Sequence, residues 1–440
     1  MSISKITGDL AAGKTTARQH LETCLEAIDS EDGRRAFITV NSDAARAEAD
    51  RVDAMRAAGA ALPPFAGVTL SVKDLFDIAG EITRAGSRVL DGAAPAARDC
   101  SVVARLRAAG FNIIGRTNMT EFAYSGLGMN PHHGNPRSPW ERDVDGGRVA
   151  GGSSSGSAVS ISDGMSAATI GSDTGGSVRV PSAWNDLVGL KTTAGRLTLE
   201  GVVPLVLKFD TIGPLCRSVE DAALLLAVME GTPPANLKGA SLQGRRFAIL
   251  RTLAFDDIRE EPLKGFDAAV ERLRDAGAMI EDIEIPEVAE ANALSVNLFS
   301  PEAYGLWKDV IEANPDVMYS EILARFRLGA EVSAPDYVGS WAALEGLRVA
   351  YDRAASKYDA VLLPSSPILP PDLERLKADS DFYVSENLLT LRNTRIGNLM
   401  GLCGLTLPTG VPSCGLMMLG QPDMEEALLR VGAAAEKVLA

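Results

Sequence analysis

The stretch GGSSSGSAVSISDGMSAATIGSDTGGSVRVP, residues 151–181, carries most of the information about how this chain folds and what it does. Two tight glycine turns, residues 151–153 and 175–177, bracket a helix-like and a strand-like segment, and each turn ends in a serine. A flexible Gly/Ser linker would lack the apolar run AATI and the charges Asp173 and Arg179 that accompany it. We therefore predict a folded segment whose two turns present serine hydroxyls.

The glycine pairs suit a particular chemistry. Glycine adopts positive φ at little cost, so consecutive backbone N–H groups in such a turn can point into one cavity. That arrangement is what an oxyanion hole requires. A serine placed directly after the turn can attack a carbonyl carbon while the N–H groups hold the charge that develops on its oxygen. The turns therefore predict a nucleophilic serine, and such a serine needs a base.

Histidine is one candidate for this base, and the chain has three: His20, His132 and His133. A Ser-His-Asp triad would have to use the pair in NPHHGNP, residues 130–136, whose proline and glycine neighbours indicate a loop. The pair is equally suited to an ordinary loop or to polar contacts with a substrate. It has neither HxxxH spacing nor an evident third ligand, so we predict no metal site.

Lysine is the other candidate. In GVTLSVKDLFDIAG, residues 67–80, Lys73 interrupts an apolar strand, and the alternation of a strand places it on the face of Ser71 and Leu75, opposite Asp74. A site of low dielectric constant pushes a lysine towards its neutral form, which a general base needs. The alternative is a lysine at a strand edge whose ammonium group reaches solvent. The pattern alone leaves both interpretations open.

Short strand-like runs and helical periodicities alternate along the rest of the chain, which predicts an α/β fold. No linker interrupts them, so we expect a single domain over residues 1–440, with a variable region at about 230–340. Thr117 is a candidate cap for a further helical turn. The predicted strands are 67–73, 111–115, 187–191, 205–209, 246–250, 278–285 and 359–366, and the predicted helices are 13–30, 44–55, 101–110, 218–229, 266–276, 298–326, 337–357 and 424–439.

Composition excludes several classes of protein. The formal net charge of -15 over 440 residues argues against a nucleic-acid partner. The five cysteines show no ligand spacing, which indicates reduced buried thiols rather than disulfides or zinc ligands. Neither a signal peptide nor an apolar stretch of about 18 residues is present, so we predict a soluble cytoplasmic protein without membrane contact.

Residues 8–15, GDLAAGKT, match the letters of a phosphate-binding P-loop, which would make the chain an ATP-binding protein. A working P-loop follows a buried strand, and only the short polar MSISKIT precedes this one. The best candidate for a magnesium-binding aspartate, Asp210 in LVLKFD, follows a run broken by Lys208. We therefore predict the end of a helical turn at 11–13 and a solvated Lys14 before Thr15 or Thr16 begins the next helix.

The chain resembles the amidase signature hydrolases in four motifs: SVKD around Lys73, GGSSSGS at 151–157, GSDTGGSVRVP at 171–181 and GLKTTAGR at 189–196. The separation of Ser153 and Ser177 is that of the family. The resemblance covers nearly the whole chain, and its specific core is about 67–220. It implies the amidase signature fold, a mixed central β-sheet with helices on both faces, and an enzyme that cleaves a carboxamide C–N bond without a cofactor.

The resemblance also implies roles for individual residues. Ser177 would be the nucleophile, and Ser153, after a cis peptide bond, would relay its proton to neutral Lys73. The same relay would return the proton to the departing ammonia or amine, and water would then release the acid. The N–H groups of Thr174, Gly175, Gly176 and Ser177 would bind the oxyanion, and Asp173 and Arg179 would form an ion pair that supports the turn.

The substrate itself is not apparent beyond a small-molecule amide. Tyr124 and Ser125 follow the helix that borders the acyl pocket in similar proteins, so they are candidates for lining it, with core packing as the rival interpretation. Aromatic residues between 290 and 340 are further candidates: Phe299, Tyr304, Trp307 and Phe326. The same fold also occurs in glutamyl-tRNA amidotransferases, where it passes ammonia to a charged tRNA within a complex. That role is our alternative function, and a homodimer stays open.

Overall fold

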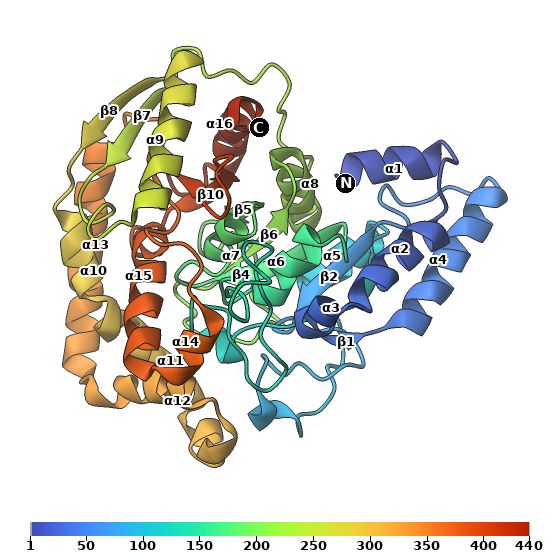
Figure 1. Ribbon diagram of the computed structural model, residues 1–440, viewed down its shortest axis with the longest axis horizontal. Helices are drawn as coiled ribbons and strands as arrows, with labels where there is room; N and C mark the ends of the chain where they lie inside the picture. Colours follow the sequence, from blue (N-terminus) through green and yellow to red (C-terminus); the bar gives the residue numbers. More distant parts are fainter. Residues whose placement is uncertain (1, 440) are drawn as a thin grey trace.

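A computed structural model of the protein describes residues 2–439, and a mixed sheet of 11 strands runs through it (Figure 1). The strand order is β1-β3-β2-β4-β6-β5-β10-β11-β9-β7-β8. The strands are β1 Phe37–Val40, β2 Thr69–Lys73, β3 Asn112–Thr117, β4 Ala168–Asp173, β5 Val188–Lys191, β6 Thr211–Cys216, β7 Arg246–Leu250, β8 Met279–Ile283, β9 Ala360–Pro364, β10 Cys403–Pro408 and β11 Gly415–Gly420. Parallel pairs (β2 with β3 and β4) and antiparallel pairs (β4 with β6) occur together, which confirms the predicted mixed α/β fold.

Helices surround the sheet, together with four short 3₁₀ turns. The helices are α1 Ile3–Ala11, α2 Ala17–Ile28, α3 Glu31–Ala36, α4 Ser42–Ala57, α5 Ser101–Ala108, α6 Ser155–Ser162, α7 Arg179–Trp184, α8 Val219–Glu230, α9 Glu260–Asp275, α10 Glu287–Ala293, α11 Ser295–Ile311, α12 Ser320–Arg327, α13 Ala334–Ala355, α14 Leu373–Ala378, α15 Ser380–Leu399 and α16 Glu425–Leu439. The 3₁₀ turns are η1 Arg88–Leu90, η2 Glu121–Ala123, η3 Pro315–Val317 and η4 Leu328–Glu331. No helix within residues 2–439 has the length and apolarity to cross a bilayer.

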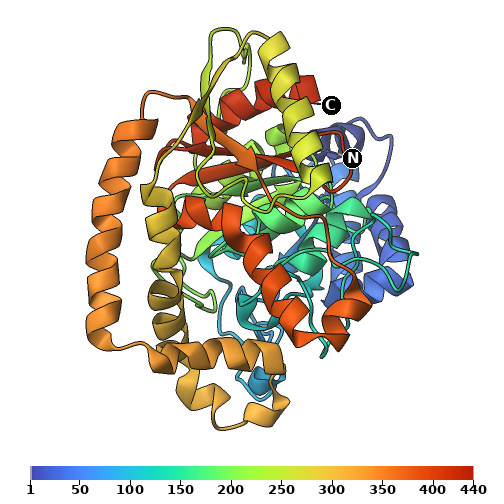
Figure 2. The ribbon, with the colours of Figure 1, turned by 60° about the vertical axis from the view of Figure 1, so that its left-hand side comes forward.

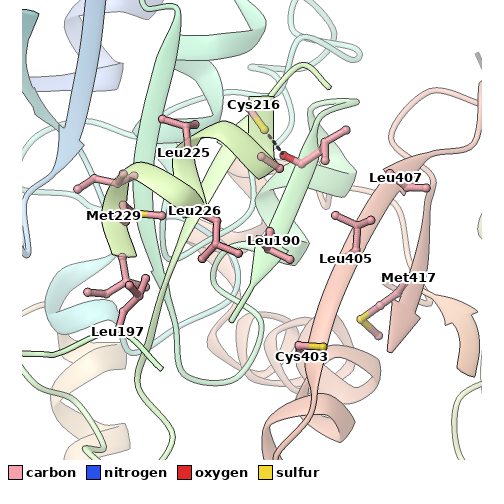
Figure 3. Packing of buried hydrophobic residues seen from close by; sticks show 14 of the residues in the cluster. Leu190, Leu197, Cys216, Leu225, Leu226, Met229, Cys403, Leu405, Leu407 and Met417 are labelled. Atoms are coloured by element: carbon pink, nitrogen blue, oxygen red, sulfur yellow. Dashed lines mark hydrogen bonds between the residues drawn. The ribbon is translucent and has the colours of Figure 1, made fainter. Parts of the chain in front are cut away.

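Strand β6 shows how helices cover both faces of the sheet. Its Leu215 packs in a cluster with Ala158 and Ile161 of α6. Its Cys216 belongs instead to the main apolar cluster, which also contains Leu225 and Leu226 of α8 (Figure 3). Because neighbouring residues of a strand point to opposite faces, α6 and α8 lie on opposite sides of β6. The predicted placement of helices on both faces is confirmed.

The centre of the sheet joins segments far apart in the sequence. Strand β5 pairs with both β6 and β10, and β10 pairs with β11, all antiparallel. Figure 3 shows Leu226 of α8 close to Leu190 of β5, with Leu405 of β10 on the other side of Leu190. The two halves of the chain therefore meet in one apolar core.

The N-terminal segment is helical where the letters of a P-loop occur. Helix α1 ends at Ala11, and Thr16 begins α2 in a capping box with Gln19. The Lys14 side chain is 71% exposed and faces only Asp9. No strand precedes Gly8 in the described chain, so the prediction of a helix end and a solvated lysine is confirmed.

Two local predictions are wrong. Residues 205–209 form a loop rather than a strand, because the Asp210 carboxylate accepts hydrogen bonds from the N–H groups of Leu205 and Val206 and curls the segment back. Thr117 caps no helix: it is the last residue of β3, and its hydroxyl lies 2.7 Å from the Ser157 hydroxyl. Thr117 thus finds a tertiary partner in Ser157, whereas Asp210 bonds to backbone N–H groups four and five residues before it, a local side-chain-to-backbone contact that competes with a strand.

Helices α11, α12 and α13 lie together at the side of the molecule, where Figure 2 shows α13 standing beside α11. Helices α11 and α12 lie within the region of about 230–340 that we predict to be variable, and α13 begins in it and continues to Ala355. The inner surface of this group faces the carboxyl edge of β4 across a cavity lined by Phe299, Ser300 and Arg325 on one side and by Ser177 on the other. The two halves of the chain thus both contribute to one cavity.

Candidate active site

The parallel pairing of β2 and β4 brings the candidate residues together. Leu70 to Val72 of β2 lie in register with Ala168 to Ile170 of β4, so both strands end at the same edge of the sheet. Lys73 ends β2, and Asp173 ends β4 immediately before the Thr174–Ser177 turn. Carboxyl ends of parallel strands are where α/β proteins commonly hold their sites.

Lys73 is fully buried and makes two close polar contacts. Its Nζ lies 2.7 Å from Ser153 Oγ and 2.8 Å from Ser172 Oγ. The Gly152–Ser153 peptide bond is cis, as the resemblance implies. A neutral lysine amine has two N–H donors and one lone pair, so it can donate to the Ser172 hydroxyl while it accepts a proton from Ser153. The alternative of a lysine that reaches solvent is therefore wrong.

Ser172 is a residue that sequence reasoning missed. It lies one residue before Asp173, in the conspicuous GSDTGGS motif, but only the pairing of β2 with β4 shows that its hydroxyl reaches Lys73. Ser154, next to the cis bond, packs behind it and donates weakly to the Ser172 carbonyl at 3.4 Å.

Burial controls the charge of Lys73. Removal from water disfavours the ammonium form and lowers the pKa of Lys73 to about 7, although the negative charges of Asp173 and Asp210 act in the opposite direction. A lysine with that pKa has a large neutral fraction at neutral pH, whereas a free lysine, with a pKa of about 10.4, is almost entirely protonated.

The Thr174–Ser177 turn presents free backbone donors next to the cavity. The N–H groups of Gly175, Gly176 and Ser177 donate to no group within residues 2–439, and Gly175 and Ser177 line the cavity. Gly176 has a φ of 143°, a conformation open to glycine and strained for other residues. The turn has the free donors that an oxyanion hole requires.

Ser177 lies at the end of this turn and faces the cavity, with 4% of its surface exposed. Its hydroxyl forms no hydrogen bond with a group of residues 2–439, while its carbonyl accepts one from Ser154 N at 3.4 Å. Lys73, Ser153 and Ser177 therefore come from three separate segments, and only the Lys73–Ser153 contact is a formed hydrogen bond. Catalytic hydrogen bonds are often long before substrate binds.

A buried ion pair lies beneath the turn. Arg179 Nη2 and Nε lie 2.9 and 3.0 Å from the two carboxylate oxygens of Asp173, and both side chains are fully buried. Burial alone would raise the pKa of Asp173, but the charge and hydrogen bonds of Arg179, with help from Lys191 and Asn398, hold it well below its usual range. Val178 N donates to the same carboxylate at 3.2 Å, so the pair connects both ends of the turn.

Two further contacts hold the turn from outside. Thr394 of α15 donates from its hydroxyl to the Gly175 carbonyl at 2.8 Å. Thr174 donates from its hydroxyl to Asp210 at 2.5 Å, and burial raises the pKa of that carboxyl to about 6. Asp210, considered above as a magnesium ligand, thus supports the turn instead.

The cavity beside Ser177 includes both residues predicted for the acyl pocket, Tyr124 and Ser125. Among the four aromatic candidates, Phe299 lines it directly, whereas Phe326 packs behind Tyr124 with ring centroids 4.9 Å apart. Tyr304 and Trp307 do not line it.

The histidines lie elsewhere. His132 Nε2 is 3.2 Å from Glu121, and His20 Nε2 is 3.1 Å from the Thr69 hydroxyl. None of the three lines the cavity that contains Ser177. The geometry therefore gives no support to a Ser-His-Asp arrangement at this serine.

Comparison with known proteins identifies the family. The family model described as Amidase matches residues 19–429, which is almost the whole chain. The chain belongs to the amidase family. Its members cleave amide C–N bonds, and this amidase is accordingly a hydrolase that acts on such bonds.

Individual relatives of this amidase are similar along its full length. It is 33% identical to the 2-amino-5-chloromuconic acid deaminase of Comamonas testosteroni, over all of this chain and 96% of that protein. It is 32% identical to a glutamyl-tRNA(Gln) amidotransferase subunit of Roseiflexus sp. (strain RS-1), again over all of this chain and 96% of the relative. A crystal structure of an amidase superposes with a TM-score of 0.90 at 30% identity and covers 100% of both chains.

Proposed function

We propose that the amidase cleaves a small carboxamide through an acyl-enzyme formed on Ser177, with Ser153 and Lys73 as its proton relay. The observation that carries the proposal is the Lys73 Nζ to Ser153 Oγ distance of 2.7 Å in a fully buried site at the edge of the Ser177 turn. Burial lowers the pKa of Lys73 to about 7, so a large fraction of the molecules has a neutral amine that can act as a base at neutral pH.

In the first step the Ser177 Oγ attacks the carbonyl carbon of the amide. Its proton passes to Ser153, whose own proton passes to the neutral amine of Lys73, which becomes an ammonium. The carbonyl oxygen becomes an oxyanion, and the free N–H groups of Gly175, Gly176 and Ser177, with that of Thr174, stabilise it. Removal of one such donor typically costs about 3 kcal/mol of transition-state stabilisation.

Collapse of this intermediate breaks the C–N bond. The proton on Lys73 returns through Ser153 to the nitrogen, which leaves as ammonia or an amine. A water molecule then attacks the acyl carbon with the same relay as base, which releases the acid and restores the Ser177 hydroxyl. In this scheme Ser172 is a positioning residue, because the one hydrogen bond of its hydroxyl within residues 2–439 is with the Lys73 amine.

Labelling with a neutral alkyl fluorophosphonate, followed by peptide mass mapping, tests the proposal. We expect an adduct on Ser177 that forms in the wild type and at least about a hundredfold more slowly in Lys73→Ala, because a general base typically contributes that much or more. Ser154→Ala is the matched control: it removes the neighbouring hydroxyl, and Ser177 should still be labelled. An adduct on another residue, or amide hydrolysis that persists in Ser177→Ala, would exclude this mechanism.

A second candidate function rests on the relatives. Several of them are named as subunits of glutamyl-tRNA(Gln) amidotransferase, so transfer of ammonia within a complex is the alternative. We favour the free hydrolase because the net charge of -15 does not favour contact with tRNA. Purification of the chain from its native cell distinguishes the two: stable partner proteins and hydrolysis of glutamine only in their presence would favour the transamidation role. A cytoplasmic location and a homodimer stay predictions.

A further inference from the structure

Two guanidinium groups face the cavity beside Ser177 without an acidic partner. Arg325 of α12 and Arg395 of α15 both line it. Neither side chain forms an ion pair or a hydrogen bond with any group of residues 2–439, and the buried Nε of Arg325 has no partner. The neighbouring arginines are satisfied: Arg327 of α12 pairs with Glu312 at 2.7 Å, and Arg392 of α15 donates to the Ala254 carbonyl at 3.2 Å.

Helix α15 places Arg395 close to the candidate oxyanion hole. Thr394 donates to the Gly175 carbonyl, and Leu391, one helical turn before Arg395, also lines the cavity. Arg395 is only 8% exposed, so the open space next to its side chain is the cavity and not bulk solvent. Its guanidinium is thus directed to the space where an amide must lie to reach Ser177.

Arg325 lines the same cavity from helix α12. Its guanidinium carbon lies 4.8 Å from the centre of the Tyr124 ring, a cation–π contact that orients it. Burial, together with the positive charge of Arg325, lowers the pKa of Arg395 to about 10, which still leaves Arg395 cationic at neutral pH. Two like charges in a partly desolvated cavity are unfavourable until an anion lies between or beside them.

The remaining surface of the cavity is apolar or uncharged. Val296, Leu328 and Leu388 are exposed hydrophobic residues, and all three line it. No aspartate or glutamate within the described residues 2–439 is among the lining side chains. The cavity therefore combines an apolar surface with a net positive charge supplied by two arginines.

We propose that the substrate is an amide that also carries a carboxylate, and that Arg325 and Arg395 bind this carboxylate while the amide carbonyl lies at Ser177. The inference rests on the proposed function and specifies its substrate class. A planar guanidinium matches the two oxygens of a carboxylate in a bidentate contact. The apolar residues Val296, Leu328 and Leu388 would contact the hydrocarbon that joins the two groups.

Protection of Ser177 from a neutral fluorophosphonate tests this inference. The competitors are benzoate, its neutral isostere nitrobenzene, and phenylphosphonate, each titrated against the initial labelling rate. We expect benzoate to protect at a half-protective concentration at least about tenfold below that of nitrobenzene, since a charge-assisted contact contributes about that factor or more.

Variants assign this preference to the two arginines. Arg395→Gln and Arg325→Gln should each raise the half-protective concentration of benzoate about tenfold or more and leave that of nitrobenzene within about threefold. Arg395→Lys should retain part of the preference because it keeps the charge. Arg327→Gln is the matched control, since it removes a paired charge from the exposed face of α12, and it should change neither value.

Three results would overturn the inference: equal protection by benzoate and nitrobenzene, an unchanged benzoate value in both glutamine variants, or stronger and arginine-dependent protection by phenylphosphonate, which would indicate phosphoryl substrates.

Calorimetric binding of benzoate to Ser177→Ala, with and without Arg395→Gln, separates this inference from the catalytic proposal. If benzoate binding depends on Arg395 but Ser177 is never labelled, the anion site is supported and Ser177 is excluded as the nucleophile. If Ser177 is labelled but benzoate does not bind, the nucleophile is supported and the anion site is excluded. Unfolding midpoints show that each variant is folded.

Discussion

Lys73 shows how strongly burial can change the charge of a single residue. An ordinary lysine would be protonated at neutral pH, and its ammonium group could not accept a proton from Ser153. Full burial changes this balance because no acidic side chain among residues 2–439 contacts its Nζ directly, and its two partners are neutral hydroxyls. The nearby negative charges of Asp173 and Asp210 act only at longer range.

The pH dependence of acylation follows from this pKa. In the proposed mechanism the active form is neutral Lys73, so kcat/KM should rise about tenfold per pH unit below the pKa of about 7 and level off above it. Asp210→Asn removes a charge that raises the pKa of Lys73, so its midpoint should lie at lower pH. Lys73→Arg should be inactive throughout, because a guanidinium stays protonated. A free lysine has a pKa of about 10.4, and a wild-type midpoint near that value would contradict the role of Lys73 as base.

Among the elements, the turn between β4 and α7 depends most on its neighbours. Its backbone conformation requires glycine at position 176, and α15 leaves no space there: a Cβ at this position would overlap the side chain of Thr394. The ion pair of Asp173 with Arg179 fixes the turn from below. The free N–H groups are therefore held in place before any substrate binds.

Two glycine substitutions separate the cost of backbone strain from the cost of the overlap with Thr394. Gly164→Ala changes a residue that also has positive φ but has no atom within 4 Å of the added carbon, so it should cost about 1–2 kcal/mol from backbone strain alone. Gly176→Ala adds the clash with Thr394 and should cost more than that, with loss of Ser177 labelling. Denaturant unfolding and the fluorophosphonate rate measure the two effects. Equal costs for both variants would show that α15 does not constrain the turn.

At the scale of the whole molecule, the sheet connects the two halves of the chain through β5 and β10. Residues 189–191 pair with residues 404–406, and the cavity takes Ser177 from one half and Arg395 from the other. Neither half has a complete site. Distant segments of the chain therefore meet both in the apolar core and in the lining of the cavity.

Truncation of Leu405 tests the importance of this central core. Leu405 is fully buried between β5 and α16, so Leu405→Ala should lower the free energy of unfolding by about 2–5 kcal/mol. Leu207→Ala is the control, since that side chain is 50% exposed, and it should change the value by no more than about 0.5 kcal/mol. Comparable effects of the two substitutions would mean that the centre of the sheet contributes little to stability.

The sequence by itself determined the chemical inventory and most of the elements. Glycine turns, strand alternation and helical periodicity are local, so the 151–181 motif, strands such as β7 and helices such as α8 and α16 can be predicted from short stretches. Local sequence was also sufficient to exclude a P-loop at GDLAAGKT, because the strand that a P-loop needs would have to precede it directly.

Tertiary structure alone decided which residues meet. The pairing of β2 with β4 brings Ser172 to Lys73, the fold brings the Thr174 hydroxyl to Asp210, and α15 brings Arg395 to the cavity. Whether Lys73 is a solvated charge or a buried base depends on the dielectric environment, which is set by packing of segments 80 to 99 residues away. Local sequence patterns carry no information on such distances, so the chemistry of the residues was visible in the sequence but their environment was not.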